Sequence, residues 1–341
     1  MNVPRSMTVR MAAQGAWNML RKRPLTVSFE VTHACTANCW HCNWGGPIKE
    51  SRLEPEGYAR IWRTMRSPVV NVSGGEPLAR GDLDEILKAL GRPGKLPWIV
   101  VVSNASQLTA ERFLRLKRAG MHQLSLSIDF PDDRHSEFRR IPGLFDRMER
   151  VVPECVKLAE EDDISLNCCI TGWNYAALPD VVRLADRWGI TVNFSAYSVL
   201  RVDEAGGLPQ HNGAKEGLKK AIAEVVELQK RGSGVYTPES TMWKYYDFLC
   251  RGHTPGCMAG NRFVVVNPDG RLTPCAMVMA YFDDQQTMLK EFTCKNECGA
   301  CYISTRANAE KSPMDLIAGN LDTLSQLLPW KWSRTSPVPS R

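Results

Sequence analysis

The chain has 341 residues, of which 43% are hydrophobic and 23% are charged, as is typical of a soluble globular protein with a substantial core. No stretch of about 18 apolar residues occurs, so we expect no membrane-spanning helix. The N-terminus lacks the apolar segment of a secretory signal, and most of the 12 cysteines lie in tight clusters. These features favour a cytoplasmic protein that binds metal over a secreted protein built on disulfides.

The formal net charge of +6 at pH 7 comes mostly from the first 25 residues, which contain no acidic residue. Their basic residues are Arg5, Arg10, Arg21, Lys22 and Arg23. Their apolar residues recur at helical spacing, at Val9, Ala13, Ala16, Trp17 and Leu20. We therefore predict a basic amphipathic helix within residues 1–24. This helix either packs against the body of the protein or lies on an anionic membrane surface, where it meets a lipid-like substrate.

Short apolar runs alternate with helical patterns from residue 25 to about residue 200. We predict strands at Leu25–Thr32, Pro68–Ser73, Trp98–Ser103, Gln123–Asp129, Ile164–Ile170 and Ile190–Tyr197. The helical patterns between them lie near 54–66, 81–91, 109–119, 143–160 and 176–187. Repeats of this kind predict an α/β fold, in which a parallel sheet with right-handed crossovers forms a partial (βα)6 TIM-like barrel.

Polar and apolar residues alternate along four of these strands. In the first strand, Ser28 and Glu30 alternate with Val27, Phe29 and Val31. We expect the apolar faces to meet the helices and the polar faces to line the interior. A closed barrel fills its interior with branched apolar side chains, so a polar lining predicts an open cavity that holds a ligand.

The remainder of the chain divides into smaller regions. Helices near 214–231 and 238–249 form a helical linker region, 206–249, after the barrel core, 25–205. A Pro-Asp-Gly turn at 268–270 joins Arg262–Asn267 to Arg271–Ala276 and predicts a β-hairpin. This hairpin lies in a cysteine-rich domain, 250–328, and a basic tail, 329–341, follows.

The most informative motif is a cysteine triplet, Cys35, Cys39 and Cys42, directly after the first strand. Three thiolates with this spacing can bind three corners of a cubane iron–sulfur cluster and leave the fourth iron without a protein ligand. Electron-transfer clusters are normally ligated by four cysteines, so an open iron indicates a catalytic site where a small molecule binds. Zinc is the alternative occupant, but it needs a fourth ligand and rarely uses this spacing.

The second strand ends in the motif Ser73-Gly74-Gly75-Glu76-Pro77. The two glycines allow the backbone to approach a ligand closely, and Glu76 can accept a hydrogen bond from an ammonium group. The triplet, the βα repeats and this motif together resemble the radical S-adenosylmethionine (SAM) superfamily over residues 25–200. The resemblance implies that Cys35, Cys39 and Cys42 bind a [4Fe–4S] cluster whose fourth iron is chelated by SAM. It also implies that Gly74, Gly75 and Glu76 bind the amino group of SAM.

Further contacts to SAM follow from the same resemblance. Asn104 belongs to Ser103-Asn104-Ala105, where family members often read Thr-Asn-Gly. Ser127 and Asp129 end the fourth strand near the expected ribose and methionine positions, although they could simply cap the next loop. Arg139 stands in the segment that often binds the SAM carboxylate, although it could be a solvated helix residue. His41 is expected to pack beside the cluster and the adenine, and an independent role as a catalytic base is the alternative.

Six cysteines cluster late in the chain, at Cys250, Cys257, Cys275, Cys294, Cys298 and Cys301. Their arrangement around the hairpin resembles the SPASM/Twitch extension of radical SAM enzymes, which carries auxiliary [4Fe–4S] clusters. A full SPASM set normally uses seven or more cysteines, so we expect one auxiliary cluster on Cys257, Cys275, Cys298 and Cys301. Cys250 and Cys294 are alternates, and a zinc ribbon is the alternative site.

Two cysteines of the fifth strand, Cys168 and Cys169, are expected to be core and lining residues. A hydrogen-donating thiol is the alternative role for Cys169.

The resemblance implies an oxidoreductase or transferase that cleaves SAM reductively to a 5′-deoxyadenosyl radical. This radical abstracts hydrogen from a peptide or small-molecule substrate, while the auxiliary cluster accepts an electron or positions the substrate. A reductant such as flavodoxin or ferredoxin is implied. Only 34 residues precede Cys35, too few for a separate leader-binding domain, which weakens the peptide option.

Two other functions stay open. One is modification of a lipid or isoprenoid at a membrane surface, suggested by the basic N-terminal segment. The other is a non-catalytic iron–sulfur or zinc protein. Nucleic acid is not an expected partner, because basic charge gathers at the chain ends without interleaved aromatic residues.

Overall fold

The structure is a computed structural model that describes residues 5–91, 94–160, 163–209 and 214–310. Its centre is an eight-stranded sheet in the order β6-β5-β4-β3-β2-β1-β7-β8. The strands are β1 Thr26–Thr32, β2 Val69–Gly74, β3 Trp98–Ser103, β4 Gln123–Ser127, β5 Ile164–Ile170, β6 Thr191–Ala196, β7 Phe263–Val266 and β8 Leu272–Thr273. All neighbours pair in parallel except β7 and β8, and the edge strands β6 and β8 do not close the sheet. The predicted open α/β barrel is confirmed.

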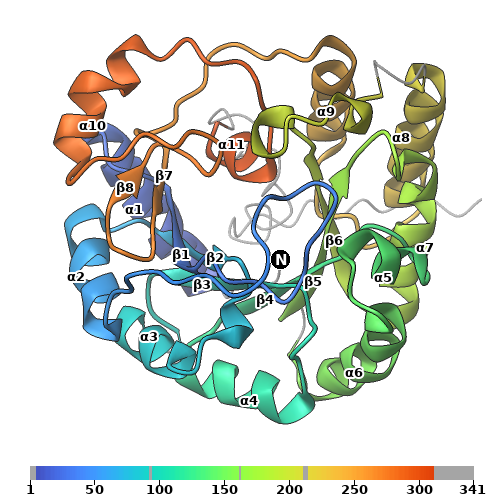
Figure 1. Ribbon diagram of the computed structural model, residues 1–341, viewed down its shortest axis with the longest axis horizontal. Helices are drawn as coiled ribbons and strands as arrows, with labels where there is room; N and C mark the ends of the chain where they lie inside the picture. The colour runs from blue at the N-terminus through green and yellow to red at the C-terminus, as the bar shows by residue number, and fades with distance from the viewer. Residues whose placement is uncertain (1–4, 92–93, 161–162, 210–213, 311–341) are drawn as a thin grey trace, which may run out of the picture. The chain divides into compact units, whose positions relative to one another are not determined.

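The helices cover the outer face of the curved sheet (Figure 1). The crossover helices are α2 Pro55–Met65, α3 Leu83–Leu90, α4 Ala110–Ala119, α6 Leu144–Leu158 and α7 Leu178–Trp188, followed by α8 Lys215–Lys230 and α9 Glu239–Arg251. Each presents an apolar face to the sheet, as in α4, where Phe113, Leu116 and Ala119 are buried. The analysis of the sequence missed the short helices α5 Arg134–Arg139, α10 Gln285–Glu291 and α11 Ser304–Ala309. These helices are too short for a periodic pattern to stand out.

The two faces of the sheet differ in the way the alternation predicts. Val27, Phe29 and Val31 of β1 are fully buried under the helices. On the interior face Ser125, Asn167 and other polar residues of the strands stay half-buried. The interior therefore offers hydrogen-bonding groups to a ligand.

The N-terminal helix α1, Arg5–Leu20, lies at the amino ends of the strands. Its Asn18 amide donates to the carbonyl oxygens of Pro24, Met65 and Arg66, at 2.8, 3.2 and 3.0 Å. These carbonyls directly precede β1 and β2. Within the described ranges, no helix has both the length and the apolar character needed to span a bilayer.

The predicted hairpin is present and continues the main sheet, because β7 pairs in parallel with β1. The β7–β8 register places Val265 opposite Thr273 across the predicted turn. The cysteine-rich segment thereby lies beside the barrel strands. The tail, 329–341, and residues 311–328 lie outside the described residues.

Candidate active site

The cysteine triplet lies on the loop that follows β1, at the carboxyl ends of the strands. The amide of Cys35 donates to the Gly46 carbonyl at 3.2 Å and folds the loop back on itself. The amide of Asn38 donates to the carbonyl of Arg139 in α5, also at 3.2 Å. Barrel enzymes place their chemistry at this end of the sheet, and here α5 holds the loop in position.

The three thiols are close enough to influence one another electrostatically. Cys35 and Cys42 are half-buried and Cys39 is buried. Burial raises the pKa of Cys39 to about 11, and the neighbouring Cys42 and Cys35 act in the same direction. The sulfur of Cys35 accepts hydrogen bonds from the amide of Ala37 at 3.4 Å and from the side chain of Asn104 at 3.7 Å. Three soft sulfur ligands on one loop suit an iron–sulfur cluster.

Gly74 and Gly75 bring the end of β2 into direct backbone contact with this loop. The amide of Gly75 donates to the Thr32 carbonyl at 2.7 Å, and that of Glu76 donates to the Ala34 carbonyl at 2.9 Å. Gly74 has a φ of +126°, and a Cβ at either glycine would collide with the Thr32 or Ala34 carbonyl. The glycine pair is therefore needed to seat the cysteine loop, whatever else it binds.

Glu76 joins the ends of β2 and β3. Its carboxylate accepts hydrogen bonds from the amide of Leu78 at 2.9 Å, the hydroxyl of Ser103 at 2.8 Å and the amide of Asn104 at 2.7 Å. The side chain is fully buried, and burial raises its pKa against these donors. Its contact with the amino group of SAM stays a prediction, because its oxygens already serve the chain itself.

A buried ion pair lies beside the triplet. Nε of Arg139 donates to Oδ2 of Asp129 at 2.6 Å, and His135 lies 3.5 Å from the same oxygen. Burial acts to raise the pKa of Asp129, but Arg139 and the two histidines His135 and His41 outweigh it and hold that pKa well below its usual range. Arg139 and Asp129 are thus structural neighbours of Cys39, and Arg139 is not a solvated helix residue.

Three buried polar atoms in this region have no hydrogen-bond partner among the described residues. They are Nδ1 of His41, Oδ1 of Asp129 and Nε2 of His135. The His41 ring stacks on Phe138, with centroids 5.1 Å apart, and burial lowers the pKa of His41 to about 4. Buried polar groups in native proteins normally have partners, so this cluster fits a polar ligand that binds next to the triplet.

Ser127, the remaining residue predicted at this site, lies on the interior face of β4 in register with Asn167 of β5. It is half-buried. The structure thus brings together His41, Asn104, Asp129 and Arg139 around the triplet, and Ser127 lies two residues before Asp129 on the interior face of β4.

A second charged network inside the barrel escaped the sequence analysis. Glu30 accepts from Nε2 of His33 at 2.9 Å and pairs with Arg201 at 3.3 Å. The rings of His33 and Trp44 stack at 4.0 Å, and Arg201 lies 5.0 Å over Trp44. Glu30 lies on the polar face of β1, so the alternation along this strand could have indicated that Glu30 is a functional residue. Arg201 belongs to the short helix η3, Val199–Arg201, and nothing in its local sequence indicated this contact.

Four late cysteines line one pocket. They are Cys257, Cys275, Cys298 and Cys301, the set predicted for an auxiliary cluster. The pocket is otherwise mostly apolar, with Leu200, Ala259, Phe263, Met277, Val278, Phe292 and Asn296. Burial raises the pKa of Cys275 to about 11 and that of Cys301 to about 12.

The alternate cysteines lie elsewhere. Cys250 packs on the main core from α9, and the exposed Cys294 donates to the Lys290 carbonyl at 2.7 Å. Cys168 is buried in the core, as expected, and Cys169 is half-buried on the interior face. Among the described residues, no group of three His, Cys, Asp or Glu side chains is arranged to hold a single metal ion.

The segment that follows β6 contacts both cysteine sites. Leu200 of η3 lines the four-cysteine pocket, while the adjacent Arg201 donates to Asn43, next to Cys42, at 3.2 Å. The hydroxyl of Ser198 donates to the Ala300 carbonyl at 2.9 Å. Both sites therefore face the same end of the barrel interior.

Comparison with known proteins identifies this arrangement. Residues 29–185 match the Radical SAM superfamily. An AdoMet-dependent heme synthase of Nitratidesulfovibrio vulgaris is 24% identical over 277 residues, which cover 73% of this chain and 72% of that protein. A PqqA peptide cyclase of Granulibacter bethesdensis is 26% identical over 268 residues, which cover 74% of this chain and 67% of that protein.

Solved structures agree with the fold. The crystal structure of SuiB from Streptococcus suis bound to S-adenosylmethionine matches with a TM-score of 0.59 and 15% identity, over 84% of this chain and 71% of that chain. Native anSMEcpe with bound AdoMet matches with a TM-score of 0.58 and 14% identity, over 89% and 99% of the two chains. The alternative of a non-catalytic metal protein is set aside, because the curated relatives are enzymes. Residues 29–185 therefore form a radical SAM domain, the kind of domain that binds a [4Fe–4S] cluster and S-adenosylmethionine, and the chain is an enzyme.

Proposed function

We propose that the enzyme uses SAM to abstract a hydrogen atom from a peptide or a polar small molecule. Cys35, Cys39 and Cys42 are the proposed cluster ligands. The proposed SAM contacts are His41, Gly74, Gly75, Glu76, Asn104, Ser127, Asp129 and Arg139. The observation that carries the proposal is the set of unpartnered buried atoms of His41, Asp129 and His135 beside the three cysteines of one loop.

When bound, the reduced cluster and SAM supply a 5′-deoxyadenosyl radical. The chain's own residues bind and orient the ligand. Oδ1 of Asp129 is free to accept from a ligand hydroxyl or amine, while Arg139 keeps this carboxylate ionised through its 2.6 Å hydrogen bond to Oδ2. His41, held against Phe138, offers a flat apolar surface at the edge of the site. Glu76 and the glycine pair fix the loop that carries the thiols.

We further propose that Cys257, Cys275, Cys298 and Cys301 bind one auxiliary [4Fe–4S] cluster. Four thiols that line one mostly apolar pocket are the ligand set of a fully coordinated cluster. A cluster held by these four cysteines would accept an electron from the substrate or position it. The proposal that residues 250–328 are a SPASM/Twitch-like domain rests on the same four cysteines.

The interior lining favours a polar substrate over a long isoprenoid chain. Half-buried Asn71, Asn167 and Asn193 and the charged pair of Glu30 and Arg201 would lose hydrogen bonds to water against a hydrocarbon. A peptide backbone or a polar metabolite can replace those bonds. The names of the relatives, a peptide cyclase and a heme synthase, are consistent with either class. A lipid or isoprenoid substrate is the weaker candidate.

The proposed partners follow from this chemistry. A one-electron reductant such as flavodoxin or ferredoxin reduces the cluster. Contact with a membrane surface is also proposed, because α1 exposes apolar and basic side chains.

Anaerobic reconstitution with iron and sulfide, followed by addition of dithionite and SAM, tests the proposal. We expect 5′-deoxyadenosine in the product mixture and about eight iron atoms per chain, from two clusters of four. Zinc in place of iron, without 5′-deoxyadenosine, contradicts it. About four iron atoms with full SAM cleavage would retain the first site and reject the auxiliary cluster.

A further inference from the structure

The N-terminal helix α1 crosses the amino ends of several strands. Arg10 donates to the carbonyl of Gly94, ahead of β3, at 3.4 Å, and Arg262, ahead of β7, donates to the sulfur of Met19 at 3.0 Å. Asn18 is fully buried against the carbonyls ahead of β1 and β2. The helix is therefore fixed at the end of the sheet opposite the cysteine triplet.

The apolar stripe of α1 points away from the rest of the chain. Val9, Trp17 and Leu20 are 55%, 48% and 80% exposed, and Ala13 and Ala16 between them are exposed as well. The helix does pack on the body, as one of the two interpretations of the sequence held, but it does so through Met7, Asn18 and Met19 on the other faces and not through this stripe. Large apolar side chains exposed in one row mark an interaction surface.

Positive charge flanks the stripe, and residues 5–25 contain no acidic residue. Arg10, Arg21 and Lys22 are exposed, and the guanidinium of Arg21 lies 4.6 Å over the ring of Trp17. Tryptophan is enriched at membrane interfaces, where its ring reaches the headgroup level. An apolar stripe bordered by basic residues is complementary to anionic lipid.

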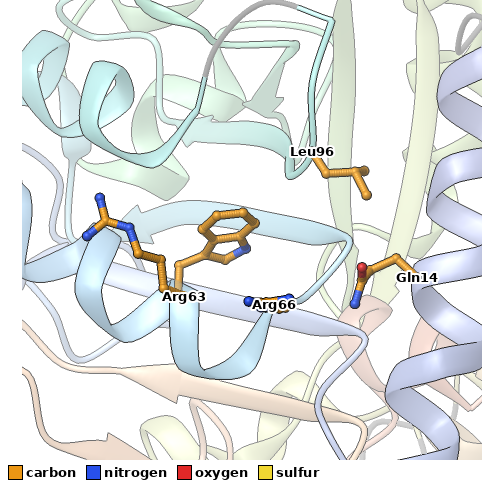
Figure 2. A pocket seen from close by; sticks show the side chains of 5 residues that line it. Gln14, Arg63, Arg66 and Leu96 are labelled. Carbon is orange, nitrogen blue, oxygen red and sulfur yellow. The ribbon is translucent and has the colours of Figure 1, made fainter.

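A pocket of about 330 Å³ opens beside α1, between Gln14 and the end of α2 (Figure 2). Arg63 and Arg66 line it together with Trp62 and Leu96. Arg63 is paired with Glu56 at 2.8 Å, whereas Arg66 forms no ion pair in the described part of the chain. The pocket extends the basic surface from α1 to α2 and offers guanidinium groups to an anionic headgroup.

We propose that the α1 surface, formed by Val9, Ala13, Ala16, Trp17 and Leu20 with Arg10, Arg21 and Lys22, docks the enzyme on an anionic membrane. The stripe inserts at the headgroup level, and the basic residues contact the lipid phosphates. Because α1 is at the amino ends of the strands, the docked enzyme presents its cysteine triplet away from the bilayer. This extends the membrane contact proposed above and separates it from a lipid substrate. It does not depend on the radical chemistry.

The test is vesicle sedimentation of the full-length, cluster-loaded protein without SAM. Phosphatidylcholine vesicles are compared with vesicles that also contain phosphatidylglycerol, at low and at high salt. We expect binding only to the anionic vesicles, weakened by salt. The double variant W17S/L20S removes the stripe, and R10Q/R21Q/K22Q removes charge. We expect the charge variant to partition on the order of a hundredfold less than wild type.

A matched control substitutes an exposed apolar residue of another helix, Leu158→Ser, where Leu158 is 48% exposed. This variant should bind vesicles as wild type does. All variants are checked by circular dichroism and for SAM cleavage. Because α1 lies at the end of the sheet opposite the cysteine triplet, these two measurements separate a folding failure from a docking failure. Absent binding to anionic vesicles, or equal loss in the Leu158→Ser control, overturns the proposal. A dimer that W17S/L20S disperses at the same concentration overturns it too, because a second copy then covers the stripe.

Discussion

The two cysteine sites are built in opposite ways. The triplet lies on one short loop, with two half-buried thiols and one buried thiol, and the charged residues around it include Asp129, Arg139 and Glu76. The four late cysteines come from separate positions between Cys257 and Cys301 and line a pocket made mostly of apolar side chains. Arg306, which is fully buried, is the cation that acts on Cys301 there.

This difference indicates different tasks. Unpartnered polar atoms and charges beside three thiols suit a site that binds a charged small molecule at an open coordination position. Four thiols enclosed by apolar side chains leave little for a polar ligand to bind and suit a fully coordinated redox centre. Substitutions at either site test this difference, and their expected effects on iron content, stability and reduction potential differ in size.

The largest effect is expected from Gly75→Ala. The added Cβ collides with the Ala34 carbonyl, so the cysteine loop has to move. We expect loss of the triplet's cluster, about four iron atoms per chain, with the auxiliary iron retained. Iron analysis after anaerobic reconstitution measures this. Gly81→Ala is the matched control, since its added Cβ meets nothing within 4 Å. Full iron content in Gly75→Ala would contradict the role given to the glycine pair.

The next effect concerns the buried ion pair. Arg139→Met leaves Asp129 buried without its main partner, a change that typically costs about 3–5 kcal/mol. In the wild-type protein the pKa of Asp129 is lower in the folded state than its ordinary value of about 3.9. Its ionised carboxylate therefore stabilises the fold at pH values above about 3.9, and this stabilisation is lost as the pH falls toward the folded-state pKa. In the variant, burial raises this pKa above the unfolded value, so stability should fall as the pH rises from about 4 to 7.

Denaturation of both proteins across this pH range measures the effect. His41 and His135 also face Asp129, and burial lowers the pKa of both, so their protonation at low pH destabilises the folded state and acts against this trend in both proteins. Arg139→Lys keeps the charge and should recover part of the loss. A loss that is the same at every pH would show that the guanidinium contributes by packing and not by charge.

A smaller and more specific effect is expected at Arg306. Its guanidinium donates to the carbonyls of Cys301 at 2.6 Å and Pro255 at 2.8 Å, next to the four-cysteine pocket. Removing a buried positive charge favours the more oxidised state of a nearby cluster. Arg306→Met should therefore lower the reduction potential of the auxiliary cluster, while Arg306→Lys should keep it close to that of wild type.

A redox titration followed by electron paramagnetic resonance reads both clusters in one sample. The potential of the triplet's cluster is the internal control and should not change. An unchanged auxiliary potential in Arg306→Met, with full iron content, would limit Arg306 to a structural role.

The smallest effect is expected at Ala105, beside Asn104 in the triplet region. Ala105 has a φ of +66°, a left-handed conformation that costs a non-glycine residue about 1–2 kcal/mol. Its methyl group is buried, which returns about 0.8 kcal/mol. Ala105→Gly should thus stabilise the protein by about 0.5 kcal/mol in urea denaturation. Ala13→Gly in the exposed face of α1 should instead destabilise it by about 1 kcal/mol. Destabilisation by Ala105→Gly would show that packing of the methyl group dominates.

Much of the fold could be predicted from the sequence because its signals are local. Each predicted barrel strand is present, with ends shifted by at most two residues, as in β4, which ends at Ser127 instead of Asp129. The alternation in β1 identified the buried face, because a strand with one apolar face has one favourable orientation. The packing of α1 on the body was one of two interpretations, but the exposure of its apolar stripe was not predictable, since periodicity defines a helix face and not what covers it.

The functional site could be predicted only where its residues lie close together in one segment of the sequence. Cys35, Cys39 and Cys42 share a loop, and their spacing was sufficient. The pairing of Asp129 with Arg139, and that of Glu30 with Arg201, depends on how distant segments meet. No local pattern contains that information. The four late cysteines were already favoured over Cys250 and Cys294 from the sequence, and the pocket beside the hairpin contains that set.

The measurement that tests the central claim most directly is 5′-deoxyadenosine formation by Cys39→Ala, Cys275→Ala and the control Cys294→Ala. Cys39 belongs to the triplet, Cys275 lines the four-cysteine pocket, and Cys294 is exposed outside both. The account predicts no SAM cleavage in Cys39→Ala, partial cleavage in Cys275→Ala and full cleavage in Cys294→Ala. Equal losses in Cys39→Ala and Cys275→Ala would contradict the division of tasks between the two sites.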